Sequence, residues 1–113
     1  MITLYGIKNC DTVKKARTWL EQNTIAYQFH DFRADGLQPQ QIKSWIDALG
    51  LETLVNKRST TWKELDDATK QQFAANAVNI ILAHPTLIKR PLLDTGKQQY
   101  VGFKETEYRT LFN

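Results

Sequence analysis

Residues 1–30 read MITLYGIKNCDTVKKARTWLEQNTIAYQFH, and the spacing of their apolar residues changes twice along this stretch. An apolar run over residues 1–5, before Gly6, is typical of a short buried strand. From Asp11 to about Gln22 the apolar residues recur at helical spacing, at Val13, Ala16, Trp19 and Leu20. Apolar and polar residues then alternate from 25 to 30, which predicts a second strand. We therefore expect a βαβ unit with parallel strands and a right-handed crossover.

The middle of the chain, from about 38 to 83, is predicted to be helical. Pro39 suits a first helical position and Gly50 a helix end, so one helix is expected between them. Thr61–Glu64 has the form of a capping box and should begin a short helix. Apolar residues between 73 and 81 predict a longer helix that ends near Ala83. We interpret this block as an insertion within one domain that spans residues 1–113.

The end of the chain predicts a hairpin and a closing helix. Two short apolar runs, at 91–94 and 99–102, flank the turn residues Thr95-Gly96-Lys97. A helix is expected from Lys104 to Leu111. The whole order is β-α-β, helical block, β-β-α, which is the order of a thioredoxin-like fold with a helical insertion. We therefore expect an α/β protein with a mixed sheet.

Composition restricts the possible classes of protein. The net charge of +3, from 15 basic and 12 acidic residues, permits binding of a small anion but is no nucleic-acid footprint. No stretch approaches the roughly 20 apolar residues of a membrane span, and the N-terminus is too polar for a signal peptide. We expect a cytoplasmic monomer that binds neither membrane nor nucleic acid directly. A single cysteine excludes a disulfide framework and a cysteine-based metal site, and no metal or bound cofactor is expected.

Cys10 is the candidate nucleophile. It follows a predicted strand and precedes a predicted helix, where unpaired amides and the helix dipole favour a thiolate. Of Cys10 and Asp11, which both lie where the N-cap of this helix is expected, Asp11 is the better capping residue. The alternative is a small buried hydrophobe, which is common for a lone cysteine, but the polar neighbours Asn9 and Asp11 favour a reactive thiol. Since Val13 leaves no Cys-x-x-Cys pair, oxidised Cys10 needs an external thiol, for which glutathione is the abundant cytosolic candidate.

Arg58, Arg90 and Pro91 are candidate binding residues. An arginine presents a planar fork of donors that suits a carboxylate or an oxyanion, although lone arginines are usually solvated surface residues. Pro91 starts a hairpin strand that, in this element order, would face Cys10. A trans bond is the usual state of such a proline.

Three segments together resemble the arsenate reductase-like (ArsC/Spx) family, most closely its YffB-type branch: LYGIKNCDTVKKA at 4–16, NKRSTTW at 56–62 and AHPTLIKRPLL at 83–93. The resemblance spans the whole chain. It implies a thioredoxin-like fold with a helical insert and a nucleophilic Cys10. It also implies a cis Pro91 and an oxyanion-binding Arg90 near the cysteine. Members similar to this chain are regarded as glutathione-dependent thiol reductases, with glutathione as co-substrate.

The sequence also departs from the family pattern. Arsenate reductases of the family have a histidine where Gly6 stands and an arginine near Gly102, and their middle arginine aligns closer to Asn56 than to Arg58. These departures argue against arsenate reduction. The Spx regulators use a Cys-x-x-Cys switch and bind RNA polymerase, whereas Val13 replaces their second cysteine.

The function we expect is therefore that of a monothiol reductase. Cys10 attacks an oxidised sulfur or a small oxyanion, and glutathione resolves the adduct. The residues expected to bind glutathione or substrate are Asn9, Asp11, Thr12, Arg58, Arg90 and Pro91. Three alternatives stay open: an Spx-like partner of the RNA polymerase α-subunit without turnover, an arsenate reductase, and an interaction module in which Cys10 is inert.

Overall fold

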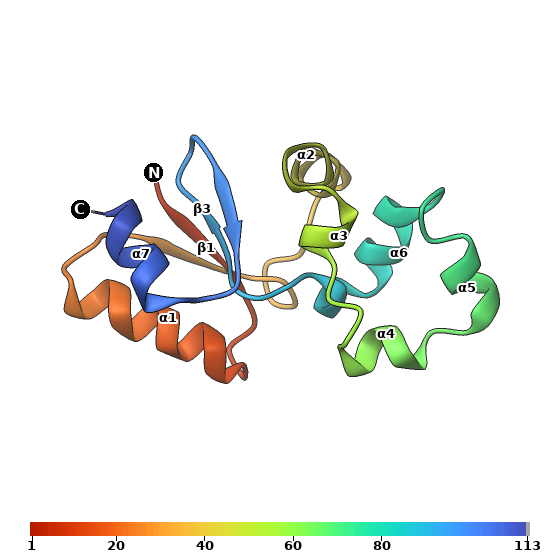
Figure 1. Ribbon diagram of the computed structural model, residues 1–113, viewed down its shortest axis with the longest axis horizontal. Helices are drawn as coiled ribbons and strands as arrows, with labels where there is room; N and C mark the ends of the chain where they lie inside the picture. Colours follow the sequence, from red (N-terminus) through yellow and green to blue (C-terminus); the bar gives the residue numbers. More distant parts are fainter. Residues whose placement is uncertain (113) are drawn as a thin grey trace.

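The computed structural model describes residues 1–112, and its elements follow the predicted order (Figure 1). In chain order they are β1 (Thr3–Gly6), α1 (Asp11–Gln22), β2 (Gln28–Asp31), α2 (Pro39–Leu49), α3 (Leu51–Leu54), α4 (Thr60–Glu64), α5 (Asp67–Gln71), α6 (Ala77–Ala83), the 3₁₀ turn η1 (Pro85–Leu87), β3 (Leu92–Asp94), β4 (Gln99–Val101) and α7 (Glu105–Leu111). The molecule is elongated, 45 × 26 × 25 Å. The sheet with α1 and α7 forms one half, and α2–α6 form the other (Figure 1).

The strands form one mixed sheet in the order β2-β1-β3-β4. β1 runs parallel to β2 and antiparallel to β3, and β4 pairs with β3 as a hairpin. This arrangement confirms the predicted thioredoxin-like α/β fold, including its parallel βαβ unit. No helix among residues 1–112 is both long and apolar enough to span a membrane.

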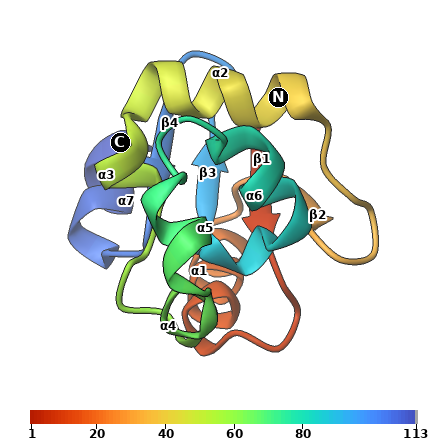
Figure 2. The ribbon, with the colours of Figure 1, turned by 90° about the vertical axis from the view of Figure 1, so that its right-hand side faces the viewer.

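Different helices cover the two faces of the sheet. Leu4 and Leu93 pack on one face, in a cluster with buried residues of α1 and α7. The neighbouring pair, Tyr5 and Leu92, points to the other face, because successive residues of a strand alternate between the two faces. Tyr5 and Leu92 pack with α2 and the helical block. Trp45 of α2 meets the Tyr5 ring edge-on, with 4.8 Å between ring centroids. Figure 2 shows α1 and α2 on opposite sides of the sheet.

Several element limits differ from the prediction. The second strand begins at Gln28 rather than at residue 25, because the Ile25 amide bonds to the Leu20 carbonyl (2.9 Å) and closes α1 instead of entering the ladder. The N-cap of α1 is Cys10, so the interpretation of Asp11 as the capping residue is wrong. α4 begins at Thr60, capped by the Ser59 hydroxyl, rather than at Thr61.

The helix predicted from about residue 73 ends at Ala83 as expected, but it is shorter than predicted because residue 73 lies outside it. The Asp66 carboxylate accepts a hydrogen bond from Thr69 N (2.7 Å) and starts the separate helix α5, which ends at Gln71. A new helix, α6, starts only at Ala77. Phe73 lies between the two helices, where it is buried edge-on against Trp62 with 5.0 Å between ring centroids. Its packing accounts for the apolar signal that the sequence pattern assigned to a helix.

Tyr108 gives a first test of the packing between α7 and the sheet. Its side chain is fully buried among Trp19, Phe103 and Phe112. Its hydroxyl has no hydrogen-bond partner among residues 1–112. Because an unpaired buried hydroxyl is unfavourable, we expect Tyr108→Phe to raise the free energy of unfolding by about 1 kcal/mol, measured by urea denaturation. A loss of stability would instead indicate a buried water that bonds the hydroxyl.

Candidate functional site

Cys10 lies where the loop after β1 enters α1. Its backbone is extended (φ −112°, ψ 122°), and its carbonyl accepts the first helical hydrogen bond, from Lys14 N (3.0 Å). Its side chain is half-buried and packs against the larger apolar cluster. Cys10 therefore occupies the N-cap position, and no side chain caps the amides of the first turn of this 12-residue helix. Those amides are free to stabilise a negative charge beside the sulfur.

Strand pairing brings Arg90 and Pro91 to the same edge of the sheet as the Cys10 loop. β3 is antiparallel to β1, and Leu92 pairs with Tyr5, so the residues before Leu92 lie beside the end of β1. The Arg90–Pro91 peptide bond is cis, as the family resemblance implied. Pro91 is buried, and its carbonyl accepts a hydrogen bond from Gly102 N (2.9 Å).

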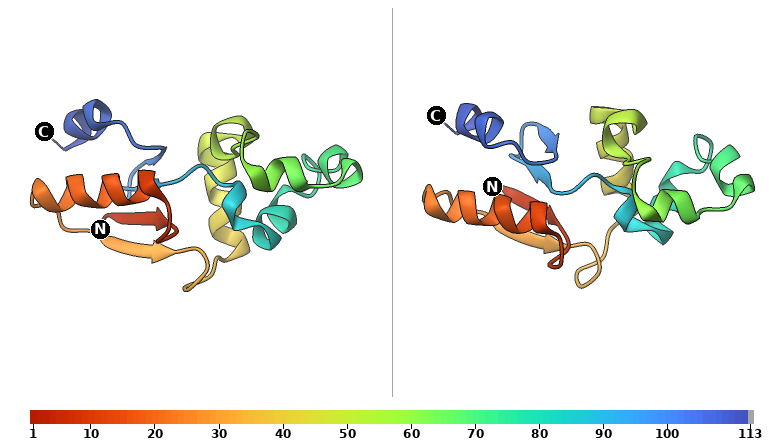
Figure 3. Two further views of the ribbon diagram at one scale, coloured as in Figure 1. Left: turned by 90° about the horizontal axis from the view of Figure 1, so that it is seen from below. Right: turned by 60° about the horizontal axis from the view of Figure 1, so that its bottom comes forward.

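A backbone connection brings Arg58 and Arg90 into the lining of one cleft. Val55 and Ile88 form an isolated antiparallel bridge, and Lys89 N donates to the Leu54 carbonyl (2.8 Å). The segments 54–58 and 87–90 therefore lie together at the junction of the two halves, which Figure 3 shows from two further directions. They line a cleft of about 810 Å³ with residues Glu52, Val55, Asn56, Lys57, Arg58, Lys89, Arg90 and Gly102. The two predicted arginines share this cleft, but Cys10, Asp11 and Thr12 do not line it.

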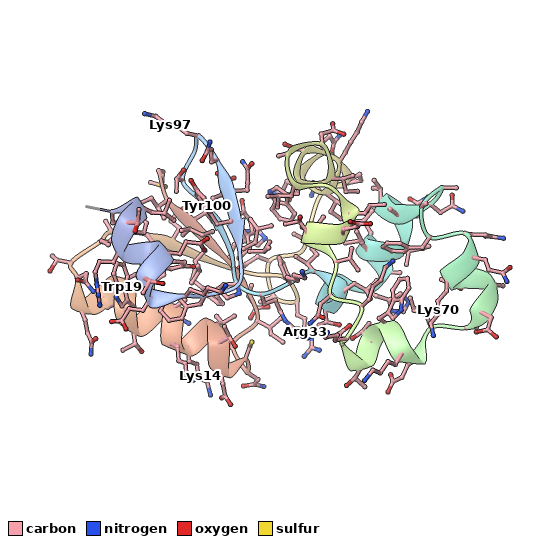
Figure 4. All side chains as sticks on the ribbon, viewed as in Figure 1. Lys14, Trp19, Arg33, Lys70, Lys97 and Tyr100 are labelled. Carbon is pink, nitrogen blue, oxygen red and sulfur yellow. The ribbon has the colours of Figure 1, made fainter. Side chains whose placement is uncertain are left out.

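A second cavity lies on the other flank of β1. It has a volume of about 400 Å³ and is lined by Ile7, Lys8, Asn9, Asp31, Arg33 and Ala34. Asn9, a predicted binding residue, therefore lies in a different cavity from Arg58 and Arg90. Figure 4 shows Arg33 at the junction between the sheet half and the helical half.

Asp31 is a site residue that sequence reasoning missed. It is 7% exposed and ends β2, directly opposite Gly6. Its Oδ1 accepts the amides of Arg33 (2.7 Å) and Ala34 (3.1 Å), and its Oδ2 accepts the amide of Lys8 (3.3 Å). Asp31 therefore ties the loop that leads to Cys10 to the loop after β2. An aspartate at a strand end before a turn was the available signal.

These contacts change the pKa of Asp31. Burial by itself would raise the pKa of the carboxyl, but the amides of Ala34, Arg33 and Lys8, together with the nearby Lys8 charge, outweigh burial and lower it. A group with a lowered folded pKa stabilises the fold above its unfolded pKa, which is about 3.9 for aspartate. That stabilisation is lost as the pH falls through the lower folded value.

We therefore expect Asp31→Asn to destabilise the protein by about 1 kcal/mol at pH 7 and by progressively less below about pH 4. The variant keeps an oxygen for Arg33 and Ala34 but loses the acceptor for Lys8 and the charge. Urea unfolding from pH 7 to about pH 2.5 measures the difference, with Asp47→Asn on an exposed position of α2 as the control. A difference that stays constant with pH would show that the charge does not contribute.

The structure places the residues at which the sequence departs from arsenate reductases. A Cβ at Gly6 would lie 2.7 Å from Val13 Cγ2, closer than side chains approach. Gly102 lines the large cleft with a positive φ of 80°, and nothing lies within 4 Å of its Cβ position.

Within residues 1–112, no three histidine, cysteine, aspartate or glutamate side chains lie close enough together to hold a metal ion.

A mixed sheet that carries a single cysteine at a helix N-cap, beside a cis-proline strand, defines a thioredoxin-like protein with a candidate thiol site. A model of the ArsC family matches residues 5–111, and the chain belongs to that family.

Three known proteins illustrate the range of this similarity. A solved structure of the protein YFFB is 42% identical, with a TM-score of 0.94 over 100% of both chains. An arsenate reductase (ArsC) related protein from Brucella melitensis is 40% identical, with a TM-score of 0.78 over 99% of this chain and 94% of its own. The global transcriptional regulator Spx 1 of Oceanobacillus iheyensis is 31% identical over 111 residues, which cover 96% of this chain and 85% of its own. The chain therefore has both arsenate reductase-like and Spx-like relatives.

Proposed function

We propose that this protein is a cytoplasmic thiol reductase that uses Cys10 as nucleophile and glutathione as reductant. The observation that carries the proposal is the position of Cys10 at the N-cap of α1, where no side chain competes for the first-turn amides. A thiolate is the nucleophilic form of cysteine, and these amides favour it. The chain has no second cysteine, so the adduct on Cys10 must be resolved by an external thiol.

The proposed cycle has two exchange steps. The Cys10 thiolate attacks the glutathione sulfur of a mixed disulfide, the S–S bond breaks, and the substrate leaves as a thiolate that takes up a proton. A second glutathione thiolate then attacks the glutathione sulfur of the Cys10 adduct, which releases glutathione disulfide and restores the Cys10 thiolate. Across the two steps, the mixed disulfide and one free glutathione become the substrate thiol and glutathione disulfide, so the substrate sulfur is reduced and the sulfur of the free glutathione is oxidised.

The other candidate residues bind and orient in this proposal. The amides from Asp11 to Val13 hold the thiolate, while Asn9 and Thr12 contact the bound molecule beside the sulfur. Arg90 and Arg58 hold a carboxylate of glutathione, because a guanidinium presents paired donors to a carboxylate. The backbone beside Pro91 pairs with the tripeptide.

Turnover coupled to NADPH through glutathione reductase tests the proposal. A small glutathione-mixed disulfide and arsenate are assayed side by side, with enzyme-free glutathione as the background. We expect turnover of the disulfide and none of arsenate, since Gly6 and Gly102 lack the groups of arsenate reductases. Preference for arsenate would replace the proposal with arsenate reduction. No turnover of either substrate would favour an Spx-like role, tested by capture with the RNA polymerase α-subunit.

A further inference from the structure

The two cavities beside the Cys10 loop concentrate the positive charge of the protein. Their linings contain six basic residues and two acidic ones: Lys8, Arg33, Lys57, Arg58, Lys89 and Arg90 against Asp31 and Glu52. This excess is larger than the net charge of +3 of the whole chain. The remainder of the protein therefore carries more acidic than basic residues, and the potential that an anion meets is focused at the junction.

Among residues 1–112, none of these six cations forms an ion pair, although the Lys8 charge lies near the Asp31 carboxylate. The ion pair between Arg109 and Glu105 is the only one among residues 1–112, and it lies on α7, away from both cavities. Lys89 and Arg90 are half-buried, so they have lost part of their hydration without gaining a carboxylate. The carboxylate of Asp31 accepts backbone amides instead. A bound anion would therefore stabilise the cluster.

Strand order sets the two cavities on opposite flanks of the cysteine loop. The smaller cavity lies at the end of β2, and the larger cleft lies at the start of β3 and the end of β4. Since the sheet order is β2-β1-β3-β4, the loop from β1 to Cys10 leaves the sheet between them. Negative groups on both sides of a sulfur held at Cys10 would each meet basic residues.

We propose that the substrate is an acidic polypeptide whose cysteine, held in a mixed disulfide with glutathione, is flanked by carboxylates on both sides. The inference rests on the proposed function and on the same two exchange steps. Lys57 and Lys89 bind the acidic residue on one side, and Lys8 and Arg33 bind the one on the other. The linings of the two cavities contain no aromatic residue on which the bases of a single-stranded nucleic acid could stack. The Trp62 ring, which lies 5.4 Å from Lys57 Nζ, packs against Phe73 and does not line either cavity.

Three glutathionylated peptides with one cysteine test the inference by turnover. The cysteine is flanked by aspartates on both sides, on one side, or by serines only. At low salt we expect kcat/KM to rise about tenfold from the serine peptide to the doubly acidic one, and the difference to vanish near 0.5 M salt, where charges are screened beyond about 4 Å. Equal turnover of the three peptides at every salt concentration would overturn the inference.

Paired variants assign the two flanks. One double variant removes the lysines of the larger cleft, Lys57→Gln with Lys89→Gln. The other removes the cations of the smaller cavity, Lys8→Gln with Arg33→Gln. Each should reduce the preference for the doubly acidic peptide several-fold. The matched control is Lys70→Gln with Lys97→Gln, which removes one charge on α5 and one at the turn between β3 and β4, both outside the two cavities (Figure 4). Circular dichroism melting confirms that each variant is folded. If the control reduced the preference as much as the cavity variants, net charge rather than the two cavities would be responsible.

A binding measurement separates this inference from the proposed function. Fluorescent versions of the acidic and neutral peptides, with serine in place of the cysteine, are titrated with the protein and followed by anisotropy. If no peptide is turned over but the acidic one binds about tenfold tighter, the proposed function fails and the charge recognition holds. A single-stranded oligonucleotide serves as the competitor. If it bound tighter than the doubly acidic peptide, the surface would be assigned to nucleic acid and the inference would fail.

Discussion

Cys10→Ser should abolish turnover of a glutathione-mixed disulfide, with a loss on the order of 10³-fold or more. A serine hydroxyl stays protonated at neutral pH, so it cannot attack the disulfide or carry the glutathione adduct. The initial rate of the NADPH-coupled assay measures the loss. Mass spectrometry should detect a glutathione adduct on the wild-type protein and none on the variant.

The same substitution should make the protein more stable. Cys10 is the N-cap of α1 without a side-chain capping bond, and serine is one of the best N-cap residues. We therefore expect Cys10→Ser to raise the free energy of unfolding by about 0.5–1 kcal/mol. A gain in stability that accompanies the loss of activity would indicate that the cysteine is held at this position for its chemistry. Retained turnover would show that another group performs the reaction.

The sequence predicts elements well where local signals decide them. The periodicity of α1 and the glycine at position 50 locate two helices with their ends. The predictions fail where a contact decides the structure. The break between α5 and α6 contains no glycine or proline, and it depends on the packing of Phe73 against Trp62. The late start of β2 depends on one hydrogen bond from Ile25 to the end of α1.

The residues of the candidate site also differ in whether local sequence signals or distant contacts determine their positions. Cys10 can be predicted because the strand, the loop and the helix that position it are contiguous in the sequence. Asp31 could not be assigned its role, because one of the three amides that it accepts belongs to Lys8, 23 residues away. The pairing of Lys57 with Lys89 in one cleft depends on the bridge between Val55 and Ile88, which joins the helical insertion to the segment before β3 without a sequence motif.

Gly6→His should cause a large loss of stability and no gain of arsenate turnover. The Cβ of any residue at this buried position would lie 2.7 Å from Cγ2 of Val13, which is itself fully buried between α1 and the sheet. Overpacking of a core costs about 1–3 kcal/mol, and an imidazole adds a polar group to that environment. Urea denaturation measures the loss, and arsenate is assayed by NADPH coupling. A stable Gly6→His variant that reduced arsenate would show that a missing histidine, not packing, sets the specificity.

A double-mutant cycle isolates the contact between the two positions. Gly6→Ala should cost about 1–3 kcal/mol because its methyl group collides with the valine, and Val13→Ala should lose stability through a cavity. In the double variant the new methyl group occupies space that the valine has left. The loss of stability of the double variant should therefore be smaller than the sum of the two single-variant losses by at least about 1 kcal/mol. Additive losses would mean that Val13 does not restrict position 6. A coupling of the expected sign would mean that Gly6 is required because helix α1, which carries Cys10 at its start, packs this closely against β1 through Val13.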